Sequence, residues 1–275
     1  MVYGKEPSDV IVVTGAGGVG MAVARRLGAG HKVVLADYSQ DALDLAGKTL
    51  DDEGYFVTTI KVDISDPEQV TALAKKAATL GPLRTIVHTA GVSAALSEPD
   101  QIVKVDVIGT ALLIDAFEEL VEPGTVMVAV ASAAGYMVDL SPEEEKLLAT
   151  VPTGELATLP VIDPSTMEPT TAYFVAKRAN HVRVEAAAVR YGAKGGRLLS
   201  ISPALIATPM GQAELTGRNR EIAEQTIDGT TSKRIGTPSD IAALVDFLVG
   251  PHASYINGTD IRIDSGLVAT QRYGR

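Results

Sequence analysis

The sequence contains no cysteine and no tryptophan among its 275 residues, and aromatic residues make up only 4%. Without cysteine the chain has no disulfide, no thiol nucleophile and no thiolate metal ligand. The four histidines are scattered, and no two stand at a helical metal-ligand spacing, so we expect no metal site. No apolar run reaches the roughly 20 residues that a bilayer-spanning helix needs. The apolar run at 10–13 is too short for a signal peptide, so we expect a cytoplasmic protein without a membrane partner.

Positive charge is scarce as well. The chain has 24 Lys and Arg against 34 Asp and Glu, which gives a formal net charge of −10. Phosphate-rich partners favour a basic surface, so this balance argues against a nucleic-acid partner. Hydrophobic residues make up 46%, which is enough for a sizeable core. No repeat or linker divides the chain, and its length suits one large domain over residues 1–275.

Short β-branched runs alternate with longer stretches of helical periodicity. The predicted strands are apolar almost throughout, as expected of strands buried on both faces of a parallel sheet. They cover 10–14, 32–37, 56–63, 83–89, 125–132, 196–202 and 259–264. The predicted helices cover 18–28, 40–53, 67–79, 98–121, 171–192 and 238–249. This alternation predicts an α/β, doubly wound Rossmann fold, with about seven parallel strands, helices on both faces and ligands beyond the carboxyl ends of the strands.

A glycine-rich loop, TGAGGVG at 14–20, follows the first predicted strand and opens the first helix. Its glycines fit the G-x-G-x-x-G pattern, which permits a tight turn, the approach of a pyrophosphate and close helix–strand contact. The pyrophosphate would meet free N–H groups and the positive end of the helix dipole. The residues expected to contact it are Gly15, Gly17, Gly18, Val19 and Gly20.

The second predicted strand ends at Asp37. Its carboxylate can accept hydrogen bonds from the adenosine ribose hydroxyls and would repel a 2′-phosphate. Tyr38 and Ser39 come next and offer no cation that could hold such a phosphate, so NAD is predicted rather than NADP. The alternative is that Asp37 is only a polar strand end.

The next two strand ends supply further candidate contacts to the cofactor. They are Asp63, Ile64, Thr89, Ala90 and Gly91. Asp63 could accept a bond from the adenine amino group, and Ala90–Gly91 leaves room for backbone contacts. His88 has no acidic or histidine neighbour in the sequence, so we interpret it as a structural residue whose hydrogen bonds are satisfied.

The stretch TTAYFVAKRAN at 170–180 places Tyr173 and Lys177 four residues apart, on one face of a predicted helix. A Y-x-x-x-K pattern by itself is weak, because two ordinary helix residues produce it by chance.

The order of these motifs resembles the short-chain dehydrogenase/reductase family along nearly the whole chain. The motifs that carry the resemblance are TGAGGVG, Asp37, HTAG at 88–91, Ser132 in ASAAG, YFVAK at 173–177 and SPALIATPM at 202–210. The segment 234–266 is also similar to the closing helix and strand of the family.

The resemblance implies roles for the central residues. Tyr173 would be the general acid for carbonyl reduction and the general base for alcohol oxidation. Lys177 would bond the nicotinamide ribose, and its charge should lower the pKa of Tyr173. Ser132 would hold the substrate oxygen. The nicotinamide half of the cofactor would contact Pro203, Ala204, Ile206, Thr208 and Met210, in addition to Tyr173 and Lys177.

The sequence departs from the family pattern at three short motifs. The glycine loop is one residue shorter than the commonest form, and Ala204 stands where the family has glycine. Asp106 stands where the family has an asparagine whose backbone carbonyl positions a water in a proton relay to the lysine. Asp106 could keep that catalytic role and would act on the pKa of Lys177, or it could be an ordinary helix residue.

The largest departure is an insert at 136–168, between Ser132 and Tyr173. It contains SPEEEKLLATV, in which Ser141 is expected to cap a helix that begins at Pro142. The insert could be a lid over an apolar pocket, or it could pack on the domain surface or on a partner subunit. Its position in the chain favours the lid. An apolar lid predicts a hydrophobic substrate, with a steroid- or terpenoid-like molecule as a candidate by analogy.

The sequence therefore predicts an NAD(H)-dependent oxidoreductase that interconverts a secondary alcohol and a ketone. One alternative is an NAD-binding regulatory protein with an idle catalytic centre. Another is a nucleotide-sugar epimerase or dehydratase of the extended relatives, which usually carry an added C-terminal substrate domain. The resemblance implies a homodimer or homotetramer, and it predicts that 211–235 is a poorly ordered region that covers the substrate.

Overall fold

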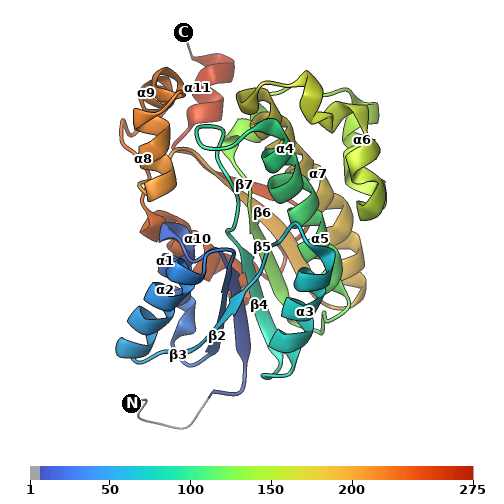
Figure 1. Ribbon diagram of the computed structural model, residues 1–275, viewed down its shortest axis with the longest axis vertical. Coiled ribbons are helices and arrows are strands. Elements are labelled where there is room, and N and C mark those ends of the chain that lie inside the picture. The colour runs from blue at the N-terminus through green and yellow to red at the C-terminus, as the bar shows by residue number, and fades with distance from the viewer. Residues whose placement is uncertain (1–6, 275) are drawn as a thin grey trace.

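A parallel sheet of seven strands forms the centre of the computed structural model, which describes residues 7–274 (Figure 1). The strand order is β3-β2-β1-β4-β5-β6-β7, so the direction of winding reverses between β1 and β4. The strands are β1 (Val10–Thr14), β2 (Lys32–Asp37), β3 (Phe56–Lys61), β4 (Leu83–His88), β5 (Val126–Val130), β6 (Arg197–Pro203) and β7 (Asp260–Ile263). The predicted doubly wound fold is confirmed, and ligands of such folds bind at the reversal point.

Helices cover both faces of the sheet, and each face has its own apolar core. One face packs against α1 (Gly18–Gly28), α2 (Gln40–Asp52) and α10 (Pro238–Val249). The other face packs against α3 (Pro67–Ala78), α5 (Thr110–Glu118) and α7 (Pro169–Ala193). Alternate residues of β1 enter opposite cores, as the two-residue period of a strand requires. None of the helices in residues 7–274 is both long enough and apolar enough to cross a bilayer.

The predicted helix at 98–121 is a continuous coil of three parts. It begins as α4 (Pro99–Ile102), continues as a π-helical segment (Val103–Gly109) and ends as α5. The π-helical segment contains Asp106, whose side chain is buried behind the carboxyl end of β4. Wider π turns inside helices are frequent at functional sites.

The segment expected to be poorly ordered contains two helices, α8 (Pro209–Thr216) and α9 (Arg220–Gly229). Thr208 caps α8 by accepting a hydrogen bond from the Gly211 N–H at 3.1 Å. Arg218, between the two helices, donates to the Ala94 and Ser97 carbonyls at 2.7 and 2.6 Å. These bonds fix the segment against the turn that follows β4. A last helix, α11 (Leu267–Tyr273), packs beside α9.

The insert lies along the outer side of α7 (Figure 1). Its helix α6 (Pro142–Thr150) begins with the predicted Ser141 cap, which forms a capping box with Glu144. Short 3-10 turns follow at Thr153–Thr158, Pro160–Ile162 and Pro164–Thr166. Leu148, Leu156 and Ile162 are buried in an apolar cluster with residues of α7.

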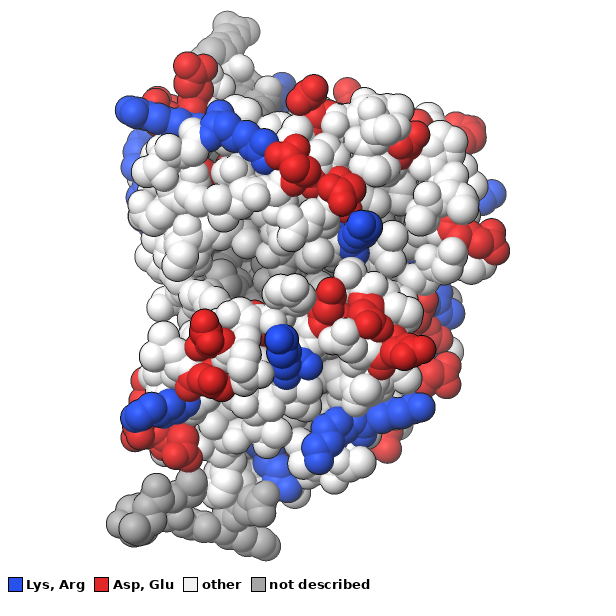
Figure 2. Space-filling model, viewed as in Figure 1, with Lys and Arg blue, Asp and Glu red and all other residues white. Residues whose placement is uncertain are grey.

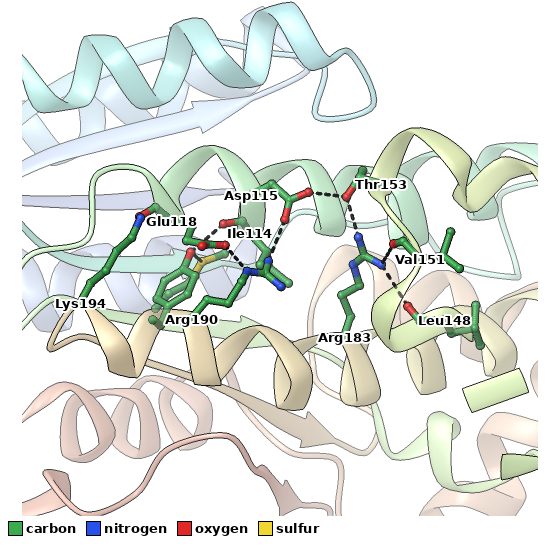
Figure 3. Close-up of polar contacts among 11 residues, drawn as sticks. Ile114, Asp115, Glu118, Leu148, Val151, Thr153, Arg183, Arg190 and Lys194 are labelled. Carbon is green, nitrogen blue, oxygen red and sulfur yellow. Dashed lines mark hydrogen bonds and ion pairs between the residues drawn. The ribbon is translucent and has the colours of Figure 1, made fainter. Parts of the chain in front are cut away.

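Polar contacts fasten the insert as well (Figure 3). Arg183 of α7 donates to the Val151 carbonyl at 2.6 Å and to the Leu148 carbonyl at 3.2 Å. It also donates to the Thr153 hydroxyl at 2.7 Å, and Thr153 in turn donates to Asp115 of α5. The insert is therefore held by α5 and α7 through both apolar and polar contacts.

Candidate active site

A cavity of about 840 Å³ opens beyond the carboxyl ends of the central strands. It is lined by Ser132 and by all residues that the sequence predicts to contact a cofactor. These lining residues are Gly15, Gly17, Gly18, Val19, Gly20, Asp37, Tyr38, Asp63, Ile64, Thr89, Ala90, Gly91, Tyr173, Lys177, Pro203, Ala204, Ile206, Thr208 and Met210. Asp106 is the one predicted site residue that does not line the cavity. No residue of the insert lines it either, so the insert packs on the surface of α7 and walls no part of this pocket.

The glycine loop has the shape that a pyrophosphate needs. Gly15 has a φ of +93°, a left-handed conformation that favours glycine. A Cβ at Gly20 would lie 1.8 Å from the Gly15 carbonyl oxygen, so only glycine lets α1 approach the loop this closely. A Cβ at Gly17 would meet no atom within 4 Å, and no side chain caps α1. The loop therefore leaves open space and free N–H groups at a helix N-terminus, where an anion can bind.

Asp37 at the end of β2 faces this loop. Its Oδ2 accepts a hydrogen bond from the Ala16 N–H at 2.7 Å, and its Oδ1 accepts one from the Ser39 N–H at 2.8 Å. Each carboxylate oxygen can accept a further bond, so both can still bind ribose hydroxyls. The next residue, Tyr38, is uncharged and 70% exposed. The loop and Asp37 together fit the adenosine half of a dinucleotide.

Ser132, Tyr173 and Lys177 meet at the other end of the cavity. Ser132 follows β5, and its hydroxyl accepts a bond from the Ala134 N–H at 3.1 Å in the 3-10 turn Ala133–Tyr136. A Cβ at Gly135 would come within 2.8 Å of the α7 backbone at Lys177, so glycine lets this turn lie directly on the helix. On α7, the Lys177 Nζ lies 5.1 Å from the centre of the Tyr173 ring.

Burial raises the pKa of the Tyr173 phenol, because the charged phenolate loses solvation. The charge of Lys177 and a hydrogen bond from Ser132 act in the opposite direction. Lys177 therefore lowers the pKa of Tyr173 as predicted, but burial raises this pKa by more than Lys177 lowers it. The charges of Asp106 and Glu214 raise this pKa further.

Asp106 forms a buried ion pair with Lys177. Its Oδ2 lies 3.0 Å from the Lys177 Nζ, and its Oδ1 accepts a hydrogen bond from the Val92 N–H at 2.9 Å. Burial lowers the pKa of Lys177, but Asp106 and Tyr173 raise it by more, so the lysine stays protonated. Burial also raises the pKa of Asp106, and Lys177 opposes that shift.

His88 connects the strand ends behind this ion pair. Its Nδ1 lies 2.7 Å from the Thr14 hydroxyl, and its Nε2 lies 3.1 Å from the Thr110 hydroxyl. Thr110 donates its proton to the Asp106 carbonyl at 2.8 Å, so the Nε2 of His88 donates and its Nδ1 accepts. Burial and the nearby Lys177 lower the pKa of His88 to about 3. The histidine is neutral with both nitrogens bonded, which confirms its structural interpretation.

Several polar residues of the cavity wall are not among the predicted site residues, and two of them, Ser93 and Glu214, lie near Tyr173 or in the turn beside it. Ser93 lies in the turn after β4, and Glu214 lies on α8. Ser93 stands only two positions after the predicted Gly91, which is the one sequence signal that marks it. Glu214 falls in the segment expected to be poorly ordered, and no pattern marks it.

Figure 2 shows that acidic and basic side chains are interspersed on one face of the molecule, without a large basic patch on that face. Within residues 7–274, no group of three acidic, histidine or cysteine side chains could hold a metal ion.

Two family models match the chain, one after the other. Residues 9–140 match the model described as short chain dehydrogenase, and residues 146–268 match one described as enoyl-(acyl carrier protein) reductase. The boundary between the two matches falls within the insert.

Individual proteins match along almost the whole length. The chain is 34% identical over 263 residues to a short-chain dehydrogenase/reductase of Alternaria brassicicola, covering 95% of this chain and 96% of the relative. It is 31% identical to a galactitol 2-dehydrogenase (L-tagatose-forming) of Cereibacter sphaeroides, covering 92% of each. The crystal structure of a levodione reductase superposes with a TM-score of 0.76 at 26% identity, covering 96% of this chain and 99% of that one. The chain belongs to the short-chain dehydrogenase/reductase family and is an oxidoreductase that acts on alcohols or ketones.

Proposed function

We propose that the protein uses NAD(H) to interconvert a secondary alcohol and the corresponding ketone of a neutral, largely apolar small molecule. The observation that carries this proposal is one cavity with Asp37 and the glycine loop at one end and Ser132, Tyr173 and Lys177 at the other.

The dinucleotide would be held from both ends. The free N–H groups at the start of α1 would bind the pyrophosphate, and the Asp37 carboxylate would accept bonds from the adenosine ribose. A 2′-phosphate in the same place would be repelled by Asp37, which supports NAD over NADP. Lys177 would donate to the nicotinamide ribose. When bound, the cofactor supplies or accepts the hydride.

The proton step belongs to Tyr173. In reduction its phenol donates a proton to the substrate oxygen, and in oxidation the phenolate takes that proton back. Ser132 donates a hydrogen bond to the same oxygen and stabilises charge that develops on it. The Lys177 ammonium favours the phenolate, whereas Asp106 cancels part of that effect. Asp106 thereby acts as a positioning residue that fixes the place and charge of Lys177.

The cavity walls support a neutral substrate. Two lysines line the cavity, and each is paired: Lys104 with Asp100 at 3.4 Å and Lys177 with Asp106 at 3.0 Å. An anionic substrate would therefore meet no cation on the wall that lacks an acidic partner. Val92, Leu205 and Met210 supply apolar surface. This wall, rather than an apolar lid, now supports the hydrophobic substrate, and a steroid- or terpenoid-like molecule stays a candidate. The homodimer or homotetramer and the cytoplasmic location stay predictions.

The test combines cofactor binding with turnover. The purified protein is titrated with NADH and NADPH by fluorescence, and NADH formation is then followed with NAD and a panel of neutral secondary alcohols. The proposal expects tighter binding of NADH and measurable turnover that Tyr173→Phe abolishes. Binding of NADH without turnover of any alcohol or ketone would instead favour an idle catalytic centre. Tighter binding of NADPH would contradict the cofactor assignment.

A further inference from the structure

Ser93 and Glu214 are among the polar groups of the substrate cavity that the proposed proton step does not use. Ser93 and Glu214 line the same cavity as Ser132 and Tyr173. They come from different segments of the chain: Ser93 belongs to the turn after β4, and Glu214 belongs to α8.

The Ser93 hydroxyl is buried without a partner. The residue is 3% exposed, and its Oγ forms no hydrogen bond within residues 7–274. Its backbone carbonyl accepts bonds from the Leu96 and Ser97 N–H groups at 3.1 and 3.0 Å, so the turn is held without the hydroxyl. A buried hydroxyl that bonds nothing destabilises the folded state and calls for an explanation. A ligand group in the cavity would satisfy it.

The Glu214 carboxylate lies next to the same turn. Its Oε1 accepts a long hydrogen bond of 3.4 Å from the Ala95 N–H, two residues after Ser93. Its Oε2 accepts a bond of 3.0 Å from the Asn219 side chain. Both oxygens keep room for a further bond. The charge of Glu214 also reaches Tyr173, whose pKa it raises, so the carboxylate is within electrostatic range of the reacting centre.

The two groups together select a particular chemistry. Ser93 offers a hydroxyl that can donate, and Glu214 offers an anionic acceptor. A substrate hydroxyl placed between them would accept from the first and donate to the second. A carboxylate or phosphate would be repelled by Glu214, and an ammonium group, which can only donate, would leave the Ser93 O–H proton unbonded.

We propose that Ser93 and Glu214 bind a second hydroxyl group of the substrate, so that the enzyme acts on neutral diols and hydroxyketones in preference to simple alcohols. This inference rests on the proposed function, because Ser132 and Tyr173 must hold the reacting oxygen while the second hydroxyl occupies this subsite.

The test compares substrates of one size. With the full-length protein and NAD, kcat/KM is measured for cyclohexanol, the regioisomeric cyclohexanediols, an aminocyclohexanol and a hydroxycyclohexanecarboxylate. The wild type should prefer one diol over cyclohexanol by about tenfold or more, because a site built to bond a hydroxyl rejects the analogue that lacks it. Ser93→Ala and Glu214→Gln should each remove most of that preference.

Two controls separate recognition from a structural role. Glu221→Gln, on the exposed side of α9, should keep the preference of the wild type. Ser93→Ala should leave the melting temperature unchanged or raise it, because the hydroxyl it removes has no partner. A structural effect of Glu214→Gln would lower kcat/KM for the diol and for cyclohexanol alike, and that result would contradict the inference.

A second readout does not need turnover. The dissociation constants of the same compounds from the protein–NADH complex are measured through the change in NADH fluorescence. Diol binding that weakens in both variants supports the inference. If the wild type binds NADH but favours no diol over cyclohexanol, or favours the amine or the carboxylate, the inference is overturned while the cofactor assignment stands. Failure to bind NADH contradicts the proposed function itself.

Discussion

The Asp106 Oδ2 lies 3.0 Å from the Lys177 Nζ in a position where Asp106 is only 1% exposed. A carboxylate so close to the proposed catalytic lysine changes the electrostatics of Tyr173, because it cancels much of the positive charge that favours the phenolate.

Asp106→Asn should therefore move the pH dependence of the reaction. Oxidation needs the deprotonated Tyr173, so kcat/KM for an alcohol rises with pH as the phenol ionises. Removal of the negative charge lowers the pKa of Tyr173, and the rise should shift to lower pH by roughly one unit. The fall in the rate of reduction should shift in the same direction. A shift to higher pH would mean that Lys177 loses its proton in the variant, which contradicts this account.

The same ion pair should contribute to stability. Asp106→Leu leaves the Lys177 charge buried and unpaired, and loss of one partner of such a pair costs about 3–5 kcal/mol. Asp106→Asn keeps one acceptor oxygen, for either Lys177 or the Val92 N–H, so it should cost less than the leucine. Urea unfolding of both variants measures the difference. Wild-type stability of Asp106→Leu would show that the pair contributes little.

Asp37 should control the choice of cofactor. Asp37→Ser removes an acceptor of charged hydrogen bonds, so the dissociation constant of NADH should rise by about tenfold or more. Adding Tyr38→Arg, at the exposed position that follows, should make NADPH the tighter ligand because a guanidinium binds a phosphate. Asp41→Ser, at an exposed acid of α2 outside the cavity, is the control and should change neither constant. Unchanged NADH binding in Asp37→Ser would leave Asp37 as a polar strand end.

Two glycines of one loop should respond differently to alanine. A Cβ at Gly17 meets only open space, so Gly17→Ala should fold normally but obstruct the pyrophosphate and weaken NADH binding. A Cβ at Gly20 would overlap the Gly15 carbonyl, so Gly20→Ala should destabilise the fold by about 1–3 kcal/mol or more. Melting temperatures and NADH titrations separate the two effects. Normal NADH binding in Gly17→Ala would place the pyrophosphate elsewhere.

Arg183 should hold the insert in place. Arg183→Met removes three hydrogen bonds to the insert, and bonds to charged groups are worth about 1.5–3 kcal/mol each. Arg190 lies on the same helix and forms a half-exposed ion pair with Glu118, so Arg190→Met should cost only about 0–1 kcal/mol. Limited proteolysis within 141–166 should speed up in the first variant alone. Because the insert does not line the cavity, NADH binding should stay unchanged in both.

Local patterns were sufficient to predict the fold and most of the cavity. The glycine loop, Asp37 and the Tyr173–Lys177 pair are defined by short spacings within one strand–helix unit, and such spacings can be read from the sequence alone. Contacts between distant segments were not predictable. The hydrogen bond from Ala95 to Glu214 joins residues far apart in the sequence, and it depends on the position of α8 in the folded protein.

The packing of the insert and the pKa of the Tyr173 phenol also depend on contacts between distant segments, which the sequence does not reveal. The apolar residues of the insert predict that it buries a face, but they do not specify whether that face meets the substrate or α7. The upward shift in the pKa of Tyr173 depends on burial, which a spacing of four residues does not determine.

The most direct test of the proposed mechanism is NAD-dependent turnover by the wild type and by Tyr173→Phe. An NADH titration of each protein first establishes whether the two bind the cofactor equally well. The wild type should oxidise a neutral secondary alcohol, whereas Tyr173→Phe should bind NADH equally well but lose turnover by about a hundredfold or more. Equal rates in the two proteins would contradict the assignment of Tyr173 as the proton-transferring residue.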